Sequence, residues 1–188
     1  MIRATVFAIL AAAVIFAAIG SGTANAAEAA DKKILVAYFS RSGNTAQIAT
    51  EIQRAKGGDL FEIRAQKTYP ADYQTTTEVA KAELEKDERP ALAANIANMR
   101  DYDVVFLGYP IWWGTMPMAV FTFLEANDFS GKTVVPFCTH GGGGGGRSVD
   151  DLKRTLPAAT VMDAFVVRGA NVSSVQGDVS SWLRNLGI

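Results

Sequence analysis

From residue 33 onward the chain alternates short apolar runs with longer amphipathic stretches. The apolar runs are rich in valine, isoleucine, leucine and phenylalanine and cover residues 34–39, 60–63, 102–108, 133–138 and 161–167. Runs of this length, bounded by polar residues or glycine, are typical of strands buried on both faces of a sheet. The remaining stretches predict helices over residues 45–56, 73–88, 117–125, 147–155 and 173–185. This alternation predicts an α/β domain, with a parallel sheet covered by helices on both faces.

The first 26 residues have a different pattern, which is that of a secretory signal. Arg3 precedes an uninterrupted run of apolar and small residues over 4–19, and Ala24-Asn25-Ala26 has the small-residue spacing that signal peptidase accepts. An uncleaved membrane anchor is the alternative, because the apolar run approaches the length that spans a bilayer. We therefore expect an exported protein, periplasmic or extracellular, that contacts a membrane only if this segment is retained.

The signal pattern divides the chain into three parts. We expect a signal peptide over residues 1–26, a flexible tail over 27–31 and a single domain over 32–188. The domain is long enough to bury a substantial core, and its sequence contains neither a repeat nor a linker.

The charge balance and the cysteine content of the chain bear on its binding partners and on disulfide formation. The chain has 18 Lys and Arg residues against 19 Asp and Glu residues, a formal net charge of −1. A balance so close to neutrality gives no indication of a nucleic-acid partner or of an anionic membrane surface. Cys138 is the only cysteine, which excludes an intramolecular disulfide. At the end of a buried strand this thiol is expected to be inert.

The segment after the first apolar run is the first of three candidate binding loops. In a parallel α/β sheet, ligands bind beyond the carboxyl ends of the strands, so the segments that follow strands deserve the closest reading. This one supplies hydroxyls, an amide, a glycine and a helix N-terminus in the order Ser40, Arg41, Ser42, Gly43, Asn44, Thr45. Such a set can bind a phosphate through neutral donors and the helix dipole. An ordinary capped turn, which favours the same residue types, is the alternative.

The second candidate loop follows the third apolar run and contains adjacent tryptophans. Its residues are Pro110, Ile111, Trp112, Trp113 and Gly114. Two neighbouring tryptophans in a loop cannot both face the core, so at least one is expected to line a surface or a ligand. An indole offers a flat face for stacking on a heteroaromatic ring. A packed aromatic corner is the alternative.

The third candidate loop follows the fourth apolar run and is rich in glycine. It begins Thr139, His140, Gly141, Gly142 and continues as glycine to residue 146. Six glycines carry a large entropy cost, and close approach of the backbone to a flat ligand is one reason to keep them. A floppy loop is the alternative. The run also satisfies G-x-G-x-x-G, but any glycine run does so, and we infer no dinucleotide site from it.

Taken together, the three loops resemble those of the flavodoxin family over nearly all of residues 32–188. The segment from Val36 to Thr45 is similar to the phosphate-loop signature of that family, at the end of the first strand. The resemblance implies a short-chain, three-layer flavodoxin-like fold with a five-stranded parallel sheet in the order 2-1-3-4-5. It also implies FMN as the cofactor.

The resemblance further implies a role for each loop. The residues from Ser40 to Thr45 would hold the FMN phosphate, although Arg41 either neutralises it or points into solvent. The loop from Pro110 to Gly114 would flank the isoalloxazine ring, with one of the two tryptophans stacked on it. Gly114 beside the ring could let a backbone carbonyl turn towards the flavin N5–H on reduction. The loop from Thr139 to Gly142 would lie along the other edge of the ring.

The function implied by the resemblance is electron transfer between redox partner proteins or to a small-molecule acceptor. An NAD(P)H-dependent quinone or flavin reductase of the same fold is the alternative, because flavodoxins are usually strongly acidic and this chain is nearly neutral. A flavin-free binding protein is a third possibility. We predict no catalytic residue and no metal site, and a solvent-facing His140 is preferred over one that donates a proton to the flavin.

Overall fold

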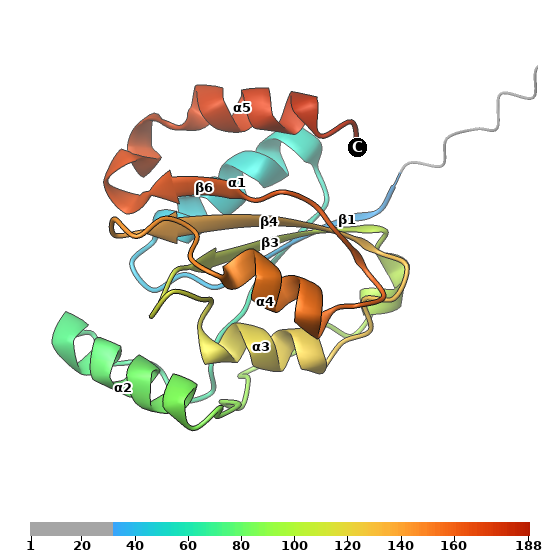
Figure 1. The fold of residues 1–188 in the computed structure, drawn as a ribbon. Helices are drawn as coiled ribbons and strands as arrows, with labels where there is room; N and C mark the ends of the chain where they lie inside the picture. The colour runs from blue at the N-terminus through green and yellow to red at the C-terminus, as the bar shows by residue number, and fades with distance from the viewer. Residues whose placement is uncertain (1–31) are drawn as a thin grey trace, which may run out of the picture. The chain divides into compact units, whose positions relative to one another are not determined.

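The computed structural model describes residues 32–188. A parallel sheet runs through this part of the chain (Figure 1). The predicted signal peptide and tail, residues 1–31, lie outside the described residues. The strands are β1 (Ile34–Tyr38), β2 (Asp59–Glu62), β3 (Val104–Pro110), β4 (Thr133–His140), β5 (Thr160–Val161) and β6 (Phe165–Arg168). They lie in the order β2-β1-β3-β4-β5, with β6 also paired to β4, which confirms the predicted order.

The fifth predicted strand is broken into two pieces, β5 and β6. Val134 pairs with Val161 but Phe137 pairs with Phe165, so one additional residue lies between the two pieces. Such an insertion is a β-bulge. A proline in the neighbouring strand favours a bulge, because it has no N–H for the regular hydrogen-bond pattern. The Val134 carbonyl accepts from the Met162 N–H at 2.9 Å. Pro136 lies two residues after Val134 on β4, so its backbone faces the same side, towards β5 and β6. Because proline has no N–H, it cannot donate a hydrogen bond to that strand.

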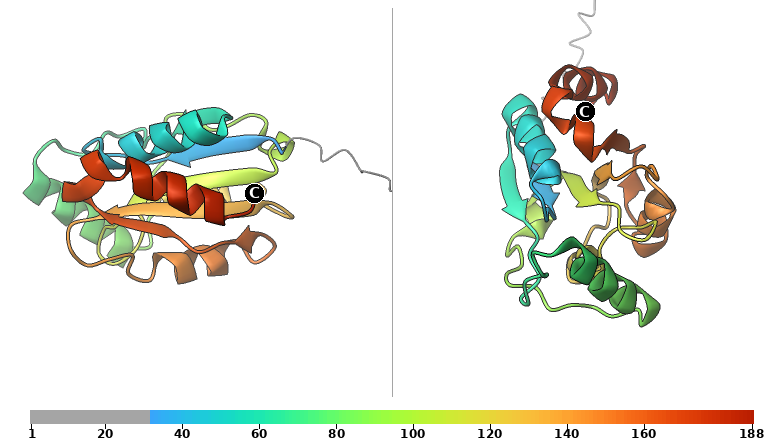
Figure 2. Two further views of the ribbon diagram at one scale, coloured as in Figure 1. Left: turned by 90° about the horizontal axis from the view of Figure 1, so that it is seen from above. Right: turned by 90° about the vertical axis from the view of Figure 1, so that its left-hand side faces the viewer.

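Helices cover both faces of the sheet, as the alternating pattern predicts. They are α1 (Asn44–Lys56), α2 (Tyr73–Glu85), α3 (Met118–Glu125), α4 (Ser148–Thr155) and α5 (Gln176–Asn185), with 3-10 turns η1 (Met99–Asp101) and η2 (Gly169–Ser174). Figure 2 shows α1 and α5 together on one face. Helices α3 and α4 lie on the other face, as Figure 1 also shows.

The core consists of two apolar layers, one on each face of the sheet. Successive residues of a strand point to opposite faces, so Leu35 packs with the layer under α3 and α4 while Val36 packs with the layer under α1 and α5. Phe106 and Phe123, one from each layer, are fully buried. Burying a side chain of this kind stabilises the fold by roughly 1.5–3 kcal/mol.

Helix α2 differs from the other helices because it does not cover the sheet. In Figure 1 it lies at the lower left, beside the carboxyl ends of the strands. Only Thr76, Ala80 and Glu83 of this helix are buried. The side chain of Asp72 caps it by accepting from the Thr75 N–H at 2.7 Å. The position of α2 gives the carboxyl edge of the sheet an additional wall.

Candidate functional site

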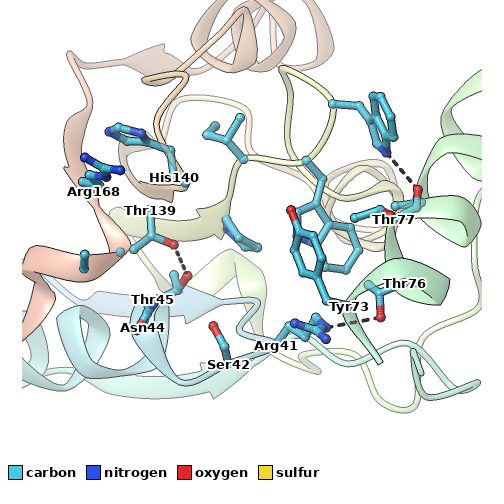
Figure 3. A pocket seen from close by; sticks show the side chains of 18 of the residues that line it. Arg41, Ser42, Asn44, Thr45, Tyr73, Thr76, Thr77, Thr139, His140 and Arg168 are labelled. Carbon is cyan, nitrogen blue, oxygen red and sulfur yellow. Dashed lines mark hydrogen bonds between the residues drawn. The ribbon is translucent and has the colours of Figure 1, made fainter. Parts of the chain in front are cut away.

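A cavity of about 770 Å³ opens at the carboxyl ends of β1, β3, β4 and β6 (Figure 3). This volume lies within the range of about 300–1,000 Å³ that small-molecule and cofactor sites occupy. Most of the predicted site residues line it, namely Arg41, Ser42, Asn44, Thr45, Pro110, Ile111, Trp112, Trp113, Thr139, His140 and Gly141. Ser40, Gly43, Gly114 and Gly142 are predicted site residues that do not line it. The three predicted loops therefore meet at one site.

The first loop presents unpaired backbone donors to the cavity. Gly43 adopts a left-handed conformation, with φ of 88°, immediately before α1. The Ser40 hydroxyl accepts from the Ala46 N–H at 3.2 Å, so Ser40 stabilises the conformation of the loop without lining the cavity. Within residues 32–188, the N–H groups of residues 42–45 have no protein acceptor. Such donors at a helix N-terminus are suited to an anion.

Two contacts fix this loop against its neighbours across the sheet. The Thr45 and Thr139 hydroxyl oxygens are 3.0 Å apart and buried, which links the first loop to the third. Gly169, after β6, lies so close to the first turn of α1 that a Cβ there would be 2.6 Å from Asn44 Nδ2. A side chain at residue 169 would displace the Asn44 amide, and the ends of β4 and β6 together hold the loop from two sides.

The tryptophan loop is a two-residue hairpin turn. The Trp112 N–H donates to the Thr115 carbonyl at 2.8 Å, and the Thr115 N–H donates back at 3.1 Å. Trp113 and Gly114 between them have φ values of 50° and 80°, as a type I′ turn requires. A positive φ is uncommon for an aromatic residue, and such strain persists only where surrounding contacts enforce it.

The two indoles have different surroundings, although both line the cavity. Trp112 is half-buried and packs edge-to-face against Phe39 and Tyr69, with ring centroids 5.4 and 5.0 Å away. Trp113 is 50% exposed, and its Nε1–H donates to the Thr77 carbonyl of α2 at 2.9 Å. Trp112 is thus supported by the core, whereas Trp113 attaches α2 to the site.

Behind Trp112, Tyr69 is held by a partly buried carboxylate. The Tyr69 hydroxyl donates to Glu83 at 2.8 Å. Burial, reinforced by this hydrogen bond, raises the pKa of Tyr69 far above its usual range. Burial also raises the pKa of Glu83. The phenol therefore stays protonated to higher pH than that of an ordinary tyrosine, and its bond to Glu83 keeps the ring against Trp112.

Gly114 and Gly146 clamp the second loop to the third. The Arg147 N–H donates to the Gly114 carbonyl at 2.8 Å. A Cβ at residue 146 would be 2.2 Å from that carbonyl oxygen. In this arrangement the Gly114 carbonyl is engaged by the start of α4, and the expectation that a backbone carbonyl of this loop turns towards a flavin stays a prediction. Around Gly141 and Gly143 there is open space.

A buried carboxylate reinforces the same clamp. Asp151 of α4 is 6% exposed and accepts from the Thr115 hydroxyl at 2.5 Å. Arg147 donates to it at 3.0 Å, and Arg154 also pairs with it. Because Thr115 closes the tryptophan hairpin, Asp151 ties that hairpin to α4.

The cavity carries positive charge and no acid among the described residues that line it. Arg41 donates to the Ala71 carbonyl at 2.7 Å and to the Thr76 hydroxyl at 3.3 Å, so its guanidinium holds α2. His140 accepts from the Gly144 N–H through Nδ1 at 3.1 Å, which leaves Nε2 to carry the ring proton. The cavity thus favours a neutral or anionic ligand.

Cys138, on β4, is buried outside the cavity lining. Burial raises the pKa of its thiol to about 12. A thiol that stays protonated is a poor nucleophile, which agrees with the inert role predicted for it.

Two groups of lining residues were missed by sequence reasoning. One comes from α2 and comprises Tyr73, Gln74, Thr76, Thr77 and Ala80; the other lies at the end of β6 and just after it, and comprises Arg168, Gly169 and Ala170. The second group could have been found by applying the carboxyl-end rule to the fifth strand as well. For α2 no signal existed, because its sequence is that of a polar surface helix.

Two kinds of feature are absent from the described part of the chain. Among residues 32–188, no three His, Cys, Asp or Glu side chains gather where a metal ion could be held. No helix within those residues is long and apolar enough to cross a membrane.

The parallel sheet, its strand order and a cavity built from three loops at its carboxyl edge define a flavodoxin-like protein. The chain belongs to the flavodoxin family, since the family profile described as Flavodoxin matches residues 33–186. This confirms the resemblance that the loops indicated.

Solved structures support the assignment. A protein from Bacteroides eggerthii assigned as a flavoprotein is 36% identical, with a TM-score of 0.74 over 84% of this chain and 99% of that one. A similar protein from Bacteroides uniformis is 32% identical, with a TM-score of 0.73 over 81% and 98% of the two chains. A flavoprotein from Lactobacillus acidophilus, solved in complex with FMN, shares the fold at 24% identity and a TM-score of 0.63, over 76% and 97% of the two chains.

A curated relative carries an enzymatic name. The NAD(P)H dehydrogenase (quinone) of Acidovorax ebreus is 29% identical over 96 residues, which is 50% of this chain. The match covers 45% of that protein, so the chain spans less than half the length of the curated relative.

Proposed function

We propose that this chain is an FMN-binding electron-transfer protein. The observation that carries the proposal is the convergence of three loops, from the ends of β1, β3 and β4, on one cavity of about 770 Å³. Membership of the flavodoxin family supports a flavin, and a protein of the same fold carries FMN.

The chemistry of the cavity fits FMN at both ends. Unpaired N–H groups of residues 42–45 and the hydroxyls of Ser42 and Thr45 would hold the phosphate. Trp112, fixed by the core, would present a flat wall to the ring, with Ile111 beside it. Bound FMN would supply the ability to accept and release electrons one or two at a time. The chain's own residues orient the flavin and exclude water from one side.

An NAD(P)H-dependent quinone or flavin reductase is the second candidate. The wall formed by α2 favours it, because Tyr73, Thr76 and Thr77 extend the cavity beyond the three loops and add neutral polar groups. The exposed rings of Tyr73 and Trp113, 70% and 50% exposed, border that extension. The relative named as a quinone dehydrogenase points in the same direction.

Reduction of the FMN-loaded protein distinguishes the two candidates. For an electron carrier we expect slow reduction under argon to proceed in two separable one-electron steps, with long-wavelength absorbance between them. NADPH should then reduce the protein only very slowly. Direct bleaching in one two-electron step on addition of NADPH would contradict the carrier role and establish the reductase.

A further inference from the structure

Arg168 lines the cavity and carries a positive charge that no carboxylate among residues 32–188 pairs with. Six of the nine arginines in residues 32–188 lie within ion-pair distance of a carboxylate: Arg54, Arg64, Arg89, Arg100, Arg147 and Arg154. Arg41 is engaged with α2, and Arg184 donates to the Ser181 hydroxyl at 2.9 Å. For the Arg168 side chain, no acceptor occurs within the described part of the chain.

The backbone that carries Arg168 is fixed beside the first turn of α1. Arg168 is the last residue of β6 and lies in register with His140 of β4. The next residue, Gly169, lies against the Asn44 amide, since a Cβ there would be 2.6 Å from Asn44 Nδ2. Figure 3 shows Arg168 beside His140 on the same side of the cavity as Thr139 and Thr45, whereas Arg41 lies towards α2. The two arginines therefore serve different ends of the cavity.

We infer that Arg168 is a phosphate-binding residue, whose guanidinium supplies positive charge to the phosphate monoester of the ligand in this cavity. The inference rests on the proposed function and deepens it. The N–H groups of residues 42–45 are neutral donors, and none of the described residues that line the cavity is an acid that would compete for the guanidinium. A guanidinium forms charge-assisted, often bidentate hydrogen bonds with phosphate, which are stronger than those of neutral donors. The phosphate would thus be held by the N-terminus of α1 and by a guanidinium from the end of β6.

The test compares FMN with riboflavin, which has the same ring and side chain but no phosphate. Dissociation constants for both flavins are measured by fluorescence quenching on the full-length protein, Arg168→Gln and Arg168→Lys. For Arg168→Gln we expect FMN binding to weaken by roughly fivefold to tenfold, a modest range because the side chain is exposed. Riboflavin binding should be unchanged. Arg168→Lys should weaken FMN binding less than Arg168→Gln does, because lysine retains the positive charge but not the planar guanidinium.

Two further variants sharpen the comparison. Arg184→Gln removes an exposed arginine that lies on α5, outside the cavity lining, and should leave both affinities unchanged. Arg41→Gln should weaken FMN and riboflavin alike, because Arg41 fixes the α2 wall rather than the phosphate end. Raising the salt concentration should reduce FMN affinity less for Arg168→Gln than for the unaltered protein.

Each remaining outcome counts against the inference. An Arg168→Gln protein that binds FMN normally would show that the arginine is merely solvated. Equal weakening for both flavins would show that Arg168 acts on the shape of the cavity and not on the phosphate. If the unaltered protein binds neither flavin, the proposed function itself fails, and this is seen before any variant is compared.

Discussion

Replacing Gly146 with alanine is expected to weaken FMN binding by roughly tenfold or more, which corresponds to about 1.4 kcal/mol or more. The φ of 55° at this residue is unfavourable for any side chain, and a Cβ there would be 2.2 Å from the Gly114 carbonyl oxygen. A backbone oxygen cannot move aside without moving the tryptophan hairpin, so the clamp between the second and third loops should open.

The matched control is Gly143→Ala in the same glycine run. Residue 143 has open space around its Cβ position and no left-handed φ, so alanine should be accepted there. FMN titrations of both variants, with thermal unfolding as a check on folding, measure the contrast. Equal FMN affinity for the two variants would mean that the clamp does not shape the binding site.

Replacing Asp151 with alanine is expected to lower the free energy of unfolding by about 2 kcal/mol, through the loss of a buried, multiply hydrogen-bonded carboxylate. The Thr115 hydroxyl and the side chains of Arg147 and Arg154 would lose their shared acceptor. Both arginines are more than half exposed, so water would stabilise them and limit the cost. Because Thr115 closes the tryptophan hairpin, FMN affinity should fall as well.

Asp150→Ala is the matched control for Asp151→Ala. Asp150 lies in the same first turn of α4, where it interacts equally with the helix dipole, but it is exposed. We expect this change to cost no more than about 0.5 kcal/mol in chemical denaturation. A similar loss for both variants would show that the helix dipole, and not the bond to Thr115, accounts for the effect. A double-mutant cycle with Thr115→Val isolates that bond.

The fold was predictable because its strands are apolar on both faces. A run such as residues 104–107 can be buried only within a sheet that is covered on both sides, and this pattern indicates a parallel sheet. The order of its strands came from the resemblance to the flavodoxin family. The break in the fifth strand was not predictable from that strand alone. It depends on Pro136 in the neighbouring strand, and pairing between strands is a tertiary property.

The site was predictable to the extent that each loop carries its chemistry locally. Ser42, Asn44 and Thr45 line the cavity because the carboxyl-end rule places any loop after the first strand there. The role of Gly146 was hidden, since it is set by a carbonyl from a different loop. Likewise, the position of Thr77 of α2 in the cavity wall was hidden, since its carbonyl accepts from the indole N–H of Trp113, which belongs to a different loop.

The visible absorption spectrum of the purified protein tests the central claim most directly. The protein is examined as isolated, then after incubation with FMN and removal of the unbound flavin by gel filtration. We predict flavin bands that remain with the protein at about one FMN per chain, with flavin fluorescence quenched by the neighbouring indole. A colourless protein that keeps no added FMN would contradict the account and leave the fold without the proposed function.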